Sequence, residues 1–150
     1  MSAFKKVFLF IGLLFCTFSL FAQNSVPIEV ATQNWATALS SNNPKKIADL
    51  YEPGAILYAT FQNQLDTPAG IQGYFTKLMK HKNLTVKFDK QNIRMFGETA
   101  LNSGLYTFSY TEDQGKLEKV VKIPARYTFV FAHEADGWKI VEHHSSVLPE

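Results

Sequence analysis

The chain has 150 residues, of which 46% are apolar and 14% aromatic, and it carries a formal charge of +2 and one cysteine. This length allows one domain of ordinary size. The aromatic content excludes a disordered tail protein, and the single cysteine excludes a disulfide scaffold. The near-neutral charge excludes a polybasic arm for nucleic acid. Composition therefore leaves a globular fold and does not define its chemistry.

Residues 1–22 have the pattern of a secretory signal peptide. Lys5 and Lys6 precede an apolar run that continues to Phe21, and the small residue Ala22 stands where cleavage is expected. A single membrane anchor is the alternative, because the run is about as long as the shortest spanning helices. No stop-transfer flank follows the run, so cleavage is the favoured interpretation.

Removal of residues 1–22 would change the composition of the chain. The segment holds the only cysteine, Cys16, which follows Phe15 rather than the small residue of a lipoprotein signal, so lipidation is not expected. It also holds two of the 15 basic residues, which leaves 13 against 13 acidic ones in residues 23–150. We therefore expect a neutral periplasmic or secreted domain, without a nucleic-acid partner and without membrane attachment after cleavage.

Three helices are predicted in the first half of this domain. One runs from Pro27 to Leu39 with apolar residues every three or four positions, and a second begins at Pro44 after the cap Asn43. A third follows Asp66-Thr67-Pro68 and closes at Asn83. The second helix is expected to present Ile47, Leu50 and Tyr51 and to end at Pro53-Gly54, before a short β-prone segment from Ala55 to Phe61.

Four long strands are predicted in the second half, where the apolar period changes from about 3.6 to 2. They start at Leu84, Leu101, Val120 and Trp138, and tight turns at Gly97-Glu98, Asp113-Gln114-Gly115 and Ala135-Asp136-Gly137 join them. Strands joined in this way are antiparallel. The prediction is an α+β fold, with three helices covering one face of a strongly curved, mostly antiparallel sheet. Such a sheet forms a cone that is open at one end, and this opening is called the mouth below.

Five short segments in this order resemble the nuclear transport factor 2-like (cystatin-like cone) superfamily, which includes SnoaL-type cyclases and ketosteroid isomerases. The resemblance is strongest to the association domain of calcium/calmodulin-dependent protein kinase II and covers about residues 28–148. The segments are Tyr51-Glu52-Pro53-Gly54-Ala55, Tyr74-Phe75-Thr76-Lys77-Leu78, Met95-Phe96-Gly97-Glu98-Thr99-Ala100, Asp136-Gly137-Trp138-Lys139-Ile140-Val141, and His144 with Ser146. No kinase motif is present.

The resemblance implies a pocket inside the cone. Association domains carry several arginines that reach into it, and their positions fall on His81, near Tyr106 and close to Arg126. This chain therefore keeps at most one of them. Arg126 lies in an otherwise apolar strand, where it either anchors a ligand carboxylate or pairs with Glu142 or Glu98. Strict alternation would turn Arg126 away from the core, and a β-bulge would turn it inward.

The last strand contains a candidate acid/base pair. Glu142 and His144 share a face with Ile140, so both face the interior if Ile140 does. His143 then points to the opposite face, unless a bulge intervenes. The alternative is that Glu142 and His144 lie at a solvated strand end and only pair with each other.

Several aromatic side chains are expected to ring the interior of the cone, and Tyr58 and Tyr106 are the best ligand-binding candidates because a buried phenol needs a partner. The others are Trp35, Tyr51, Tyr74 and Phe75. A metal site is not expected, because the histidines lack ligand spacing and no cysteine remains after cleavage. No cofactor is implied, and no Gly-x-Ser-x-Gly elbow supports a serine hydrolase.

Two functions remain at this point. The first is an exported pocket protein that binds an aromatic or carboxylate-bearing small molecule through Arg126, Tyr106, Tyr58, His81 and His144, with isomerase or cyclase activity undecided. The second is an association module that forms homodimers through the open face of the sheet, without catalysis.

Overall fold

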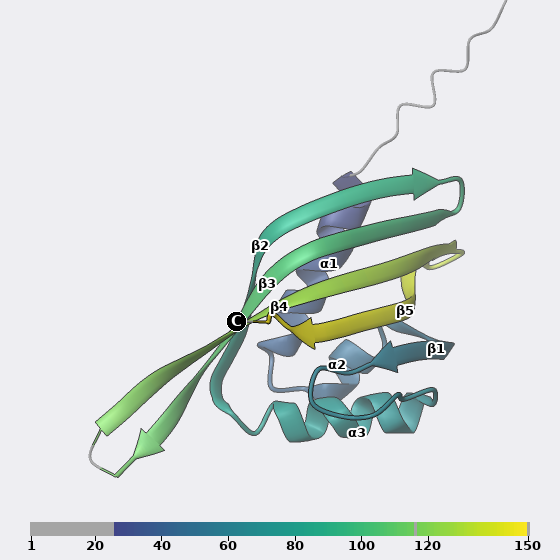
Figure 1. Ribbon diagram of the computed structural model, residues 1–150. Helices are drawn as coiled ribbons and strands as arrows, with labels where there is room; N and C mark the ends of the chain where they lie inside the picture. Colours follow the sequence, from purple (N-terminus) through teal and green to yellow (C-terminus); the bar gives the residue numbers. More distant parts are fainter. Residues whose placement is uncertain (1–25, 116, 150) are drawn as a thin grey trace, which may run out of the picture.

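The computed structural model describes residues 26–115 and 117–149 (Figure 1). The predicted signal peptide lies outside the described residues. The elements follow the order α1 (Val26–Leu39), α2 (Pro44–Ala48), β1 (Tyr51–Tyr58), α3 (Pro68–Leu78), β2 (Lys82–Phe96), β3 (Thr99–Gln114), β4 (Leu117–Glu134) and β5 (Gly137–Val147). No helix in these ranges is long and apolar enough to cross a membrane. The α+β class predicted from the sequence is confirmed.

The helices begin where the sequence predicts them. The side chain of Asn43 accepts hydrogen bonds from the backbone N–H groups of Lys45 and Lys46, and Thr67 caps α3 by accepting from the N–H of Gly70 at 3.1 Å. Both helices have proline in the first turn, where its missing N–H costs nothing.

The second helix is shorter than predicted. It ends at Ala48, and Tyr51 already belongs to β1, where it is the register partner of Ile140. Pro53 and Gly54 therefore do not stop a helix. They lie exposed on an edge strand, which tolerates proline because its outer edge needs no ladder hydrogen bond, and the register shifts between Tyr51 and Ile56.

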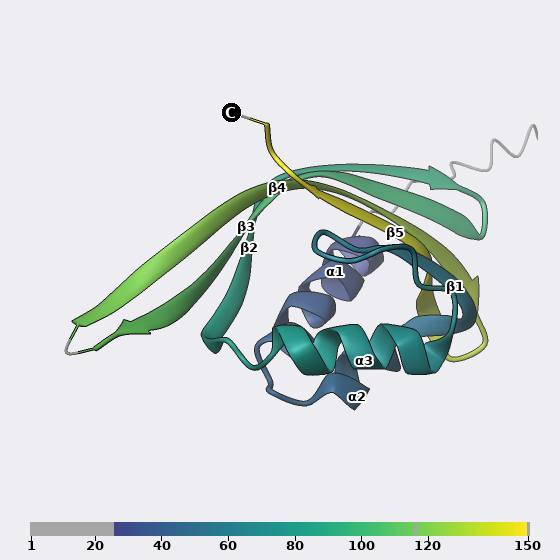
Figure 2. The same cartoon turned by 60° about the horizontal axis from the view of Figure 1, so that its bottom comes forward.

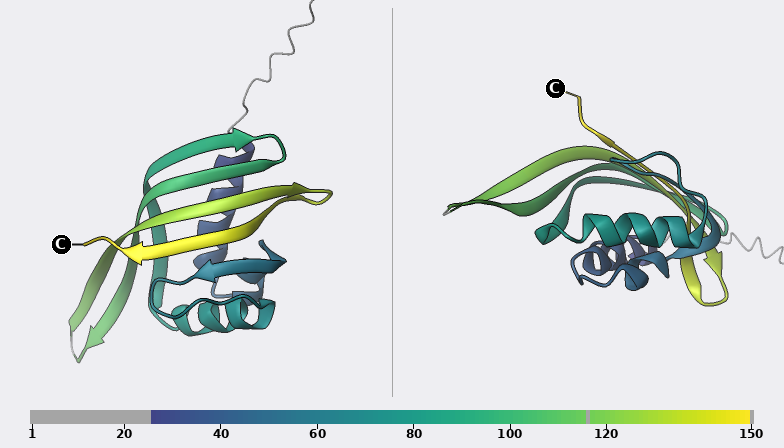
Figure 3. Two further views of the ribbon diagram at one scale, coloured as in Figure 1. Left: turned by 45° about the vertical axis from the view of Figure 1, so that its right-hand side comes forward. Right: turned by 90° about the horizontal axis from the view of Figure 1, so that it is seen from below.

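The five strands form one curved sheet in the order β1-β5-β4-β3-β2, in which only the β1–β5 pair is parallel. All three helices lie against its concave face, and no element of the described residues covers the convex face (Figures 2 and 3). Besides the shift in β1, the ladders are irregular between Lys82 and Thr85 and at two further residues. Asp89 is the extra residue in β2, between Phe88 and Lys90, and Val141 is the extra residue in β5, between Ile140 and Glu142.

The bulge in β2 brings two backbones unusually close. A Cβ on Gly104 of β3 would lie 1.9 Å from the carbonyl oxygen of Lys90, so only glycine fits there. Beside it, the buried amide of Asn102 donates to Thr32 of α1 and to Gln91 of β2, both at 2.9 Å, and accepts from Tyr127 at 3.1 Å. This polar cluster fixes α1 against the middle of the sheet.

Trp35 is the centre of the aromatic core. Its ring packs edge-on against Phe75, Phe129 and His143, with centroids 6.1, 5.2 and 5.3 Å away, and stacks on Tyr106 at 6.2 Å. α1, α3 and the sheet thus meet around one indole, which anchors both layers of the fold.

Candidate functional site

The bulge at Val141 determines which side of β5 faces the interior. Ile140 is buried, the extra residue shifts the alternation, and His143 and Ser145 become the buried positions. The prediction that Glu142 and His144 face the interior together with Ile140 is therefore wrong, because both are exposed on the other face. Two adjacent apolar residues, Ile140 and Val141, were the available sign of a bulge.

Arg126 does not enter the cone either. The β3–β4 register runs without interruption from Thr99 to Gln114, so no bulge reverses the alternation, and Tyr127 takes the inward position. Arg126 lies exposed on the convex face and donates from Nε to the hydroxyl of Ser146 at 2.9 Å. It pairs with neither Glu142 nor Glu98 in an observed salt bridge.

Tyr58 lies on the same convex side of the sheet as Arg126 and His144. It is 40% exposed at the end of β1, and its ring meets that of His144 edge-on with centroids 6.1 Å apart. Tyr58 and His144 are register partners in the parallel pair. Four candidates, Arg126, Tyr58, Glu142 and His144, are thus placed outside the cone.

Tyr106 is fully buried inside the cone, where it takes part in a chain of hydroxyl groups. Its phenol donates to Ser145, Ser145 shares a hydrogen bond with Thr60, and Thr60 is hydrogen-bonded to Tyr74 on α3. Burial raises the pKa of Tyr74 to about 12 and that of Tyr106 further, so both phenols stay protonated at neutral pH. Thr60 and Ser145 were not predicted as interior residues, because their positions depend on the loop after β1 and on the β5 bulge.

A second polar chain lies deeper in the core. The indole of Trp35 donates to the hydroxyl of Tyr51 at 2.9 Å, and that hydroxyl lies 2.8 Å from Nδ1 of His143. Burial lowers the pKa of His143 to about 3, so its ring is neutral. Its Nε2 is a buried polar atom without a hydrogen-bond partner in the described residues. The chain links α1, β1 and β5 and rigidifies the wall behind the hydroxyl groups.

His81, the remaining candidate, lies at the mouth of the cone. Its ring packs on that of Tyr110, with centroids 4.2 Å apart. Two small cavities of about 150 and 190 Å³ share Phe61, Leu78 and His81 in their walls. Tyr74 lines the second of them, so the hydroxyl chain ends at a cavity wall. We take this mouth as the candidate site.

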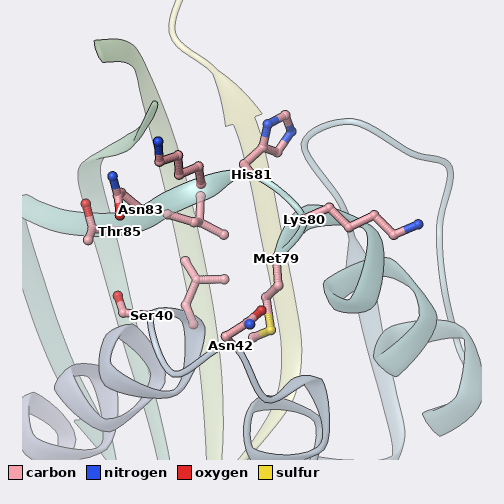
Figure 4. Close-up of a pocket in the computed structure, with 10 residues that line it drawn as sticks. Ser40, Asn42, Met79, Lys80, His81, Asn83 and Thr85 are labelled. Atoms are coloured by element: carbon pink, nitrogen blue, oxygen red, sulfur yellow. The ribbon is translucent and has the colours of Figure 1, made fainter. Parts of the chain in front are cut away.

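A larger groove of about 500 Å³ lies on the other side of the segment after α3 (Figure 4). Met79 and Asn42 point into it, whereas Lys80 and His81 point away. A cleft of about 470 Å³ lies between α1 and the β4–β5 turn, next to Trp138. No residue of the hydroxyl chain and none of the chain from Trp35 to His143 lines either hollow. Neither hollow is therefore taken as the candidate site, although both are larger than the cavities at the mouth.

The described residues include no group of three or more histidines, cysteines or carboxylates arranged to hold a metal ion. Their buried polar side chains belong to Thr32, Asn102, His143 and Ser145 and to the buried tyrosines, with no aspartate or glutamate among them. The interior thus offers hydroxyl groups and a neutral imidazole rather than a carboxylate base.

His143 predicts a pH dependence of folding stability. Its pKa in the folded protein is about 3, whereas its ordinary value is 6.5. Between these pH values the unfolded chain binds a proton at His143 and the folded chain does not. This contribution is complete above pH 6.5 and is lost at about 1.4 kcal/mol per pH unit as the pH falls toward 3. Urea unfolding between pH 7 and pH 4 measures it.

The His143→Gln variant is expected to be less stable at pH 7 and to have a flatter profile below pH 6.5, because the titrating ring is gone. His144→Gln, an exposed neighbour, is the matched control and should keep most of the slope. Equal slopes in wild type and His143→Gln would contradict the assignment.

Comparison with known proteins gives one family and one fold. The sequence pattern of the calcium/calmodulin dependent protein kinase II association domain matches residues 26–149. A Xanthomonas campestris protein assigned to that domain is 33% identical, with a TM-score of 0.75 over 82% of this chain and 86% of its own. No curated protein matches the sequence.

Two more distant structures share the fold alone. A Streptomyces avermitilis protein of the NTF2-like family, assigned as a dehydratase, is 16% identical, with a TM-score of 0.74 over 83% of this chain and 95% of its own. An NTF2-like superfamily protein from Salmonella enterica serovar Typhimurium is 18% identical, with a TM-score of 0.72 over 86% and 95%. The chain belongs to the calcium/calmodulin dependent protein kinase II association-domain family and has the NTF2-like, cystatin-like cone fold.

Proposed function

We propose that this domain binds a small, neutral, ring-containing molecule at the mouth of the cone. The observation that carries the proposal is the hydroxyl chain from Tyr106 through Ser145 and Thr60 to Tyr74, which ends at a cavity walled by Phe61 and His81. This cavity has a volume of about 190 Å³, and the adjoining cavity that shares Phe61, Leu78 and His81 has about 150 Å³, the size that accommodates benzene, so a molecule of one or two rings fits. The aromatic and aliphatic walls suit such a ring, and the hydroxyl groups suit one polar substituent.

The charges around the mouth favour a neutral ligand over a carboxylate. The cationic side chain in the cavity walls is Lys77, which is exposed at the rim, where an ion pair is worth little. Arg126, the predicted carboxylate anchor, lies on the convex face. Enzymatic proton abstraction has little support, because the described interior holds no carboxylate and His143 is a weak base.

Thermal unfolding with two probes tests the binding site. Coumarin, a neutral aromatic lactone, should raise the Tm by about 4 °C at tenfold excess over its Kd, and benzoate should not. Ser145→Ala interrupts the hydroxyl chain and His81→Ala removes a cavity wall, so both should reduce the shift with coumarin.

The controls for this experiment lie on the convex face. Ser146→Ala is the neighbour of Ser145 with the opposite orientation, and Arg126→Ala removes its hydrogen-bond partner. Both should keep the full shift. A shift that Arg126→Ala abolishes and Ser145→Ala preserves would overturn the proposal, as would a wild type indifferent to coumarin.

A second candidate function is self-association through the convex face of the sheet. All described helices lie on the other face (Figure 2). The convex face carries half-buried apolar side chains, among them Leu101, Leu105, Val130 and Val141. An uncovered apolar sheet face of this kind favours an interface between two copies.

Light scattering in solution measures this association. Wild type is expected to be at least dimeric, and Val130→Glu should reduce its mass, because a carboxylate would be buried at the interface. Val30→Glu, on the exposed side of α1, is the control and should change nothing. A monomeric wild type would exclude this function.

We also propose that residues 1–22 direct export. The basic start, the apolar run and Ala22 support this proposal. Mass spectrometry of the protein recovered outside the cytoplasm should give a chain that starts at Gln23. An intact Met1 on a membrane-bound protein would favour the anchor instead.

A further inference from the structure

The long hairpin formed by β3 and β4 extends beyond the helices as an arm, which comprises residues 110–114 of β3 and 117–123 of β4 (Figures 1 and 3). On one side, β2 begins to pair with the arm at Lys82 and Thr111. On the other side, β5 ends where Leu148 donates to the carbonyl of Pro124 at 2.9 Å. Within the described chain, the outer edge of residues 117–123 therefore has no neighbouring strand.

A free strand edge presents unpaired backbone N–H and C=O groups to another strand. Here the edge also carries exposed apolar side chains on both faces of the arm, since Leu117 is 75% and Val120 61% exposed. Its sequence is Leu117-Glu118-Lys119-Val120-Val121-Lys122-Ile123. Such an edge is suited to pairing with an added strand, because pairing satisfies the backbone groups and covers the apolar side chains.

We propose that the free edge of β4 pairs antiparallel with the same edge of a second copy of this chain. With the twofold axis at Val120, each Glu118 lies opposite Lys122 of the other copy. Residues directly opposite each other in a ladder share a face, so these two ion pairs flank the Val120 pair. On the other face, Leu117 lies opposite Ile123 in the same register.

In this register, opposite charges face each other and apolar side chains face apolar side chains, whereas the next register loses both matches. A shift by one residue sets Lys119 opposite Lys122 and Glu118 opposite Ile123, which places like charges together and a carboxylate against an apolar side chain. Glu118 already pairs with Lys82 of β2, on the far side of β3, so Lys122 of the other copy would be a second cation for the same carboxylate. Because the pairing is isologous, it closes after two copies and does not propagate into a fibre. The arm meets the ligand site at Ile123, which also lines the smaller cavity of the mouth, and it lies apart from Leu101, Leu105, Val130 and Val141 of the convex face.

The occupant is a second copy because the edge is complementary to itself in charge and in apolar pattern. The base of the edge fits this assignment, since Leu148 and Val147 are 39% and 46% exposed there. In the proposed register, the tip of the other arm arrives at this base with its Leu117. Apolar surface at both ends of the strand is covered together.

Disulfide cross-linking reads the register directly. In a Cys16→Ser background, Val120→Cys places two thiols opposite each other with Cα atoms about 5 Å apart, inside the range for a disulfide. Val121→Cys faces Lys119 instead and is the matched control. Mild oxidation should give a covalent dimer for Val120→Cys and not for Val121→Cys. Equal yields, or none for either, would overturn the proposal.

Charge reversal tests the ion pairs independently. Glu118→Lys alone and Lys122→Glu alone should each weaken arm pairing by about tenfold or more, because like charges then face each other. Mixing the two variants restores both pairs and should restore association. Lys119→Glu, which faces Val121, should have little effect.

Two measurements keep this outcome interpretable. Circular dichroism checks that each variant is folded, since Glu118→Lys also removes the salt bridge to Lys82. Val130→Glu separates the arm from the convex face and should leave the Val120→Cys cross-link intact. Failure of the mixed variants to associate better than either variant alone would exclude the ion pairs.

Discussion

The indole N–H of Trp35 is the constraint on which the rest of the interior depends. A donor buried between two layers must find an acceptor, because an unmade hydrogen bond in an apolar core is costly. Tyr51 supplies it, and Tyr51 in turn needs the imidazole of His143. His143 reaches this position only through the bulge at Val141. One buried group on a helix thus determines where β1 begins and which side of β5 faces the core.

The arrangement explains which parts of the fold could be predicted. The helices, the four long strands and the α+β layering follow from apolar periodicity and from turn and cap residues such as Asn43 and Thr67. The family resemblance gave the fold correctly for the same reason. The interior side chains of β5 could not be predicted, since one inserted residue reverses the alternation and leaves only the weak sign of Ile140 next to Val141.

The candidate site was predicted less well than the fold. Tyr106 was correctly assigned to the interior, and His81, a ligand-binding candidate, lies in the walls of the mouth cavities. Arg126, Tyr58, Glu142 and His144 lie outside the cone. The three residues that the family resemblance approximately aligned with inward arginines, His81, Tyr106 and Arg126, thus place an imidazole at the rim, a phenol inside and a guanidinium on the opposite face. The described interior therefore holds hydroxyl groups and no charged side chain.

The hydroxyl chain also has an adjustable direction. Tyr106 is fully buried and donates to Ser145. The hydrogen bond between Ser145 and Thr60 can take either direction, and Thr60 continues the chain to Tyr74. Every member is a hydroxyl group, and a hydroxyl group can both donate and accept. The end of the chain at Tyr74 can therefore present a donor or an acceptor to a bound molecule, so the same wall suits more than one polar substituent.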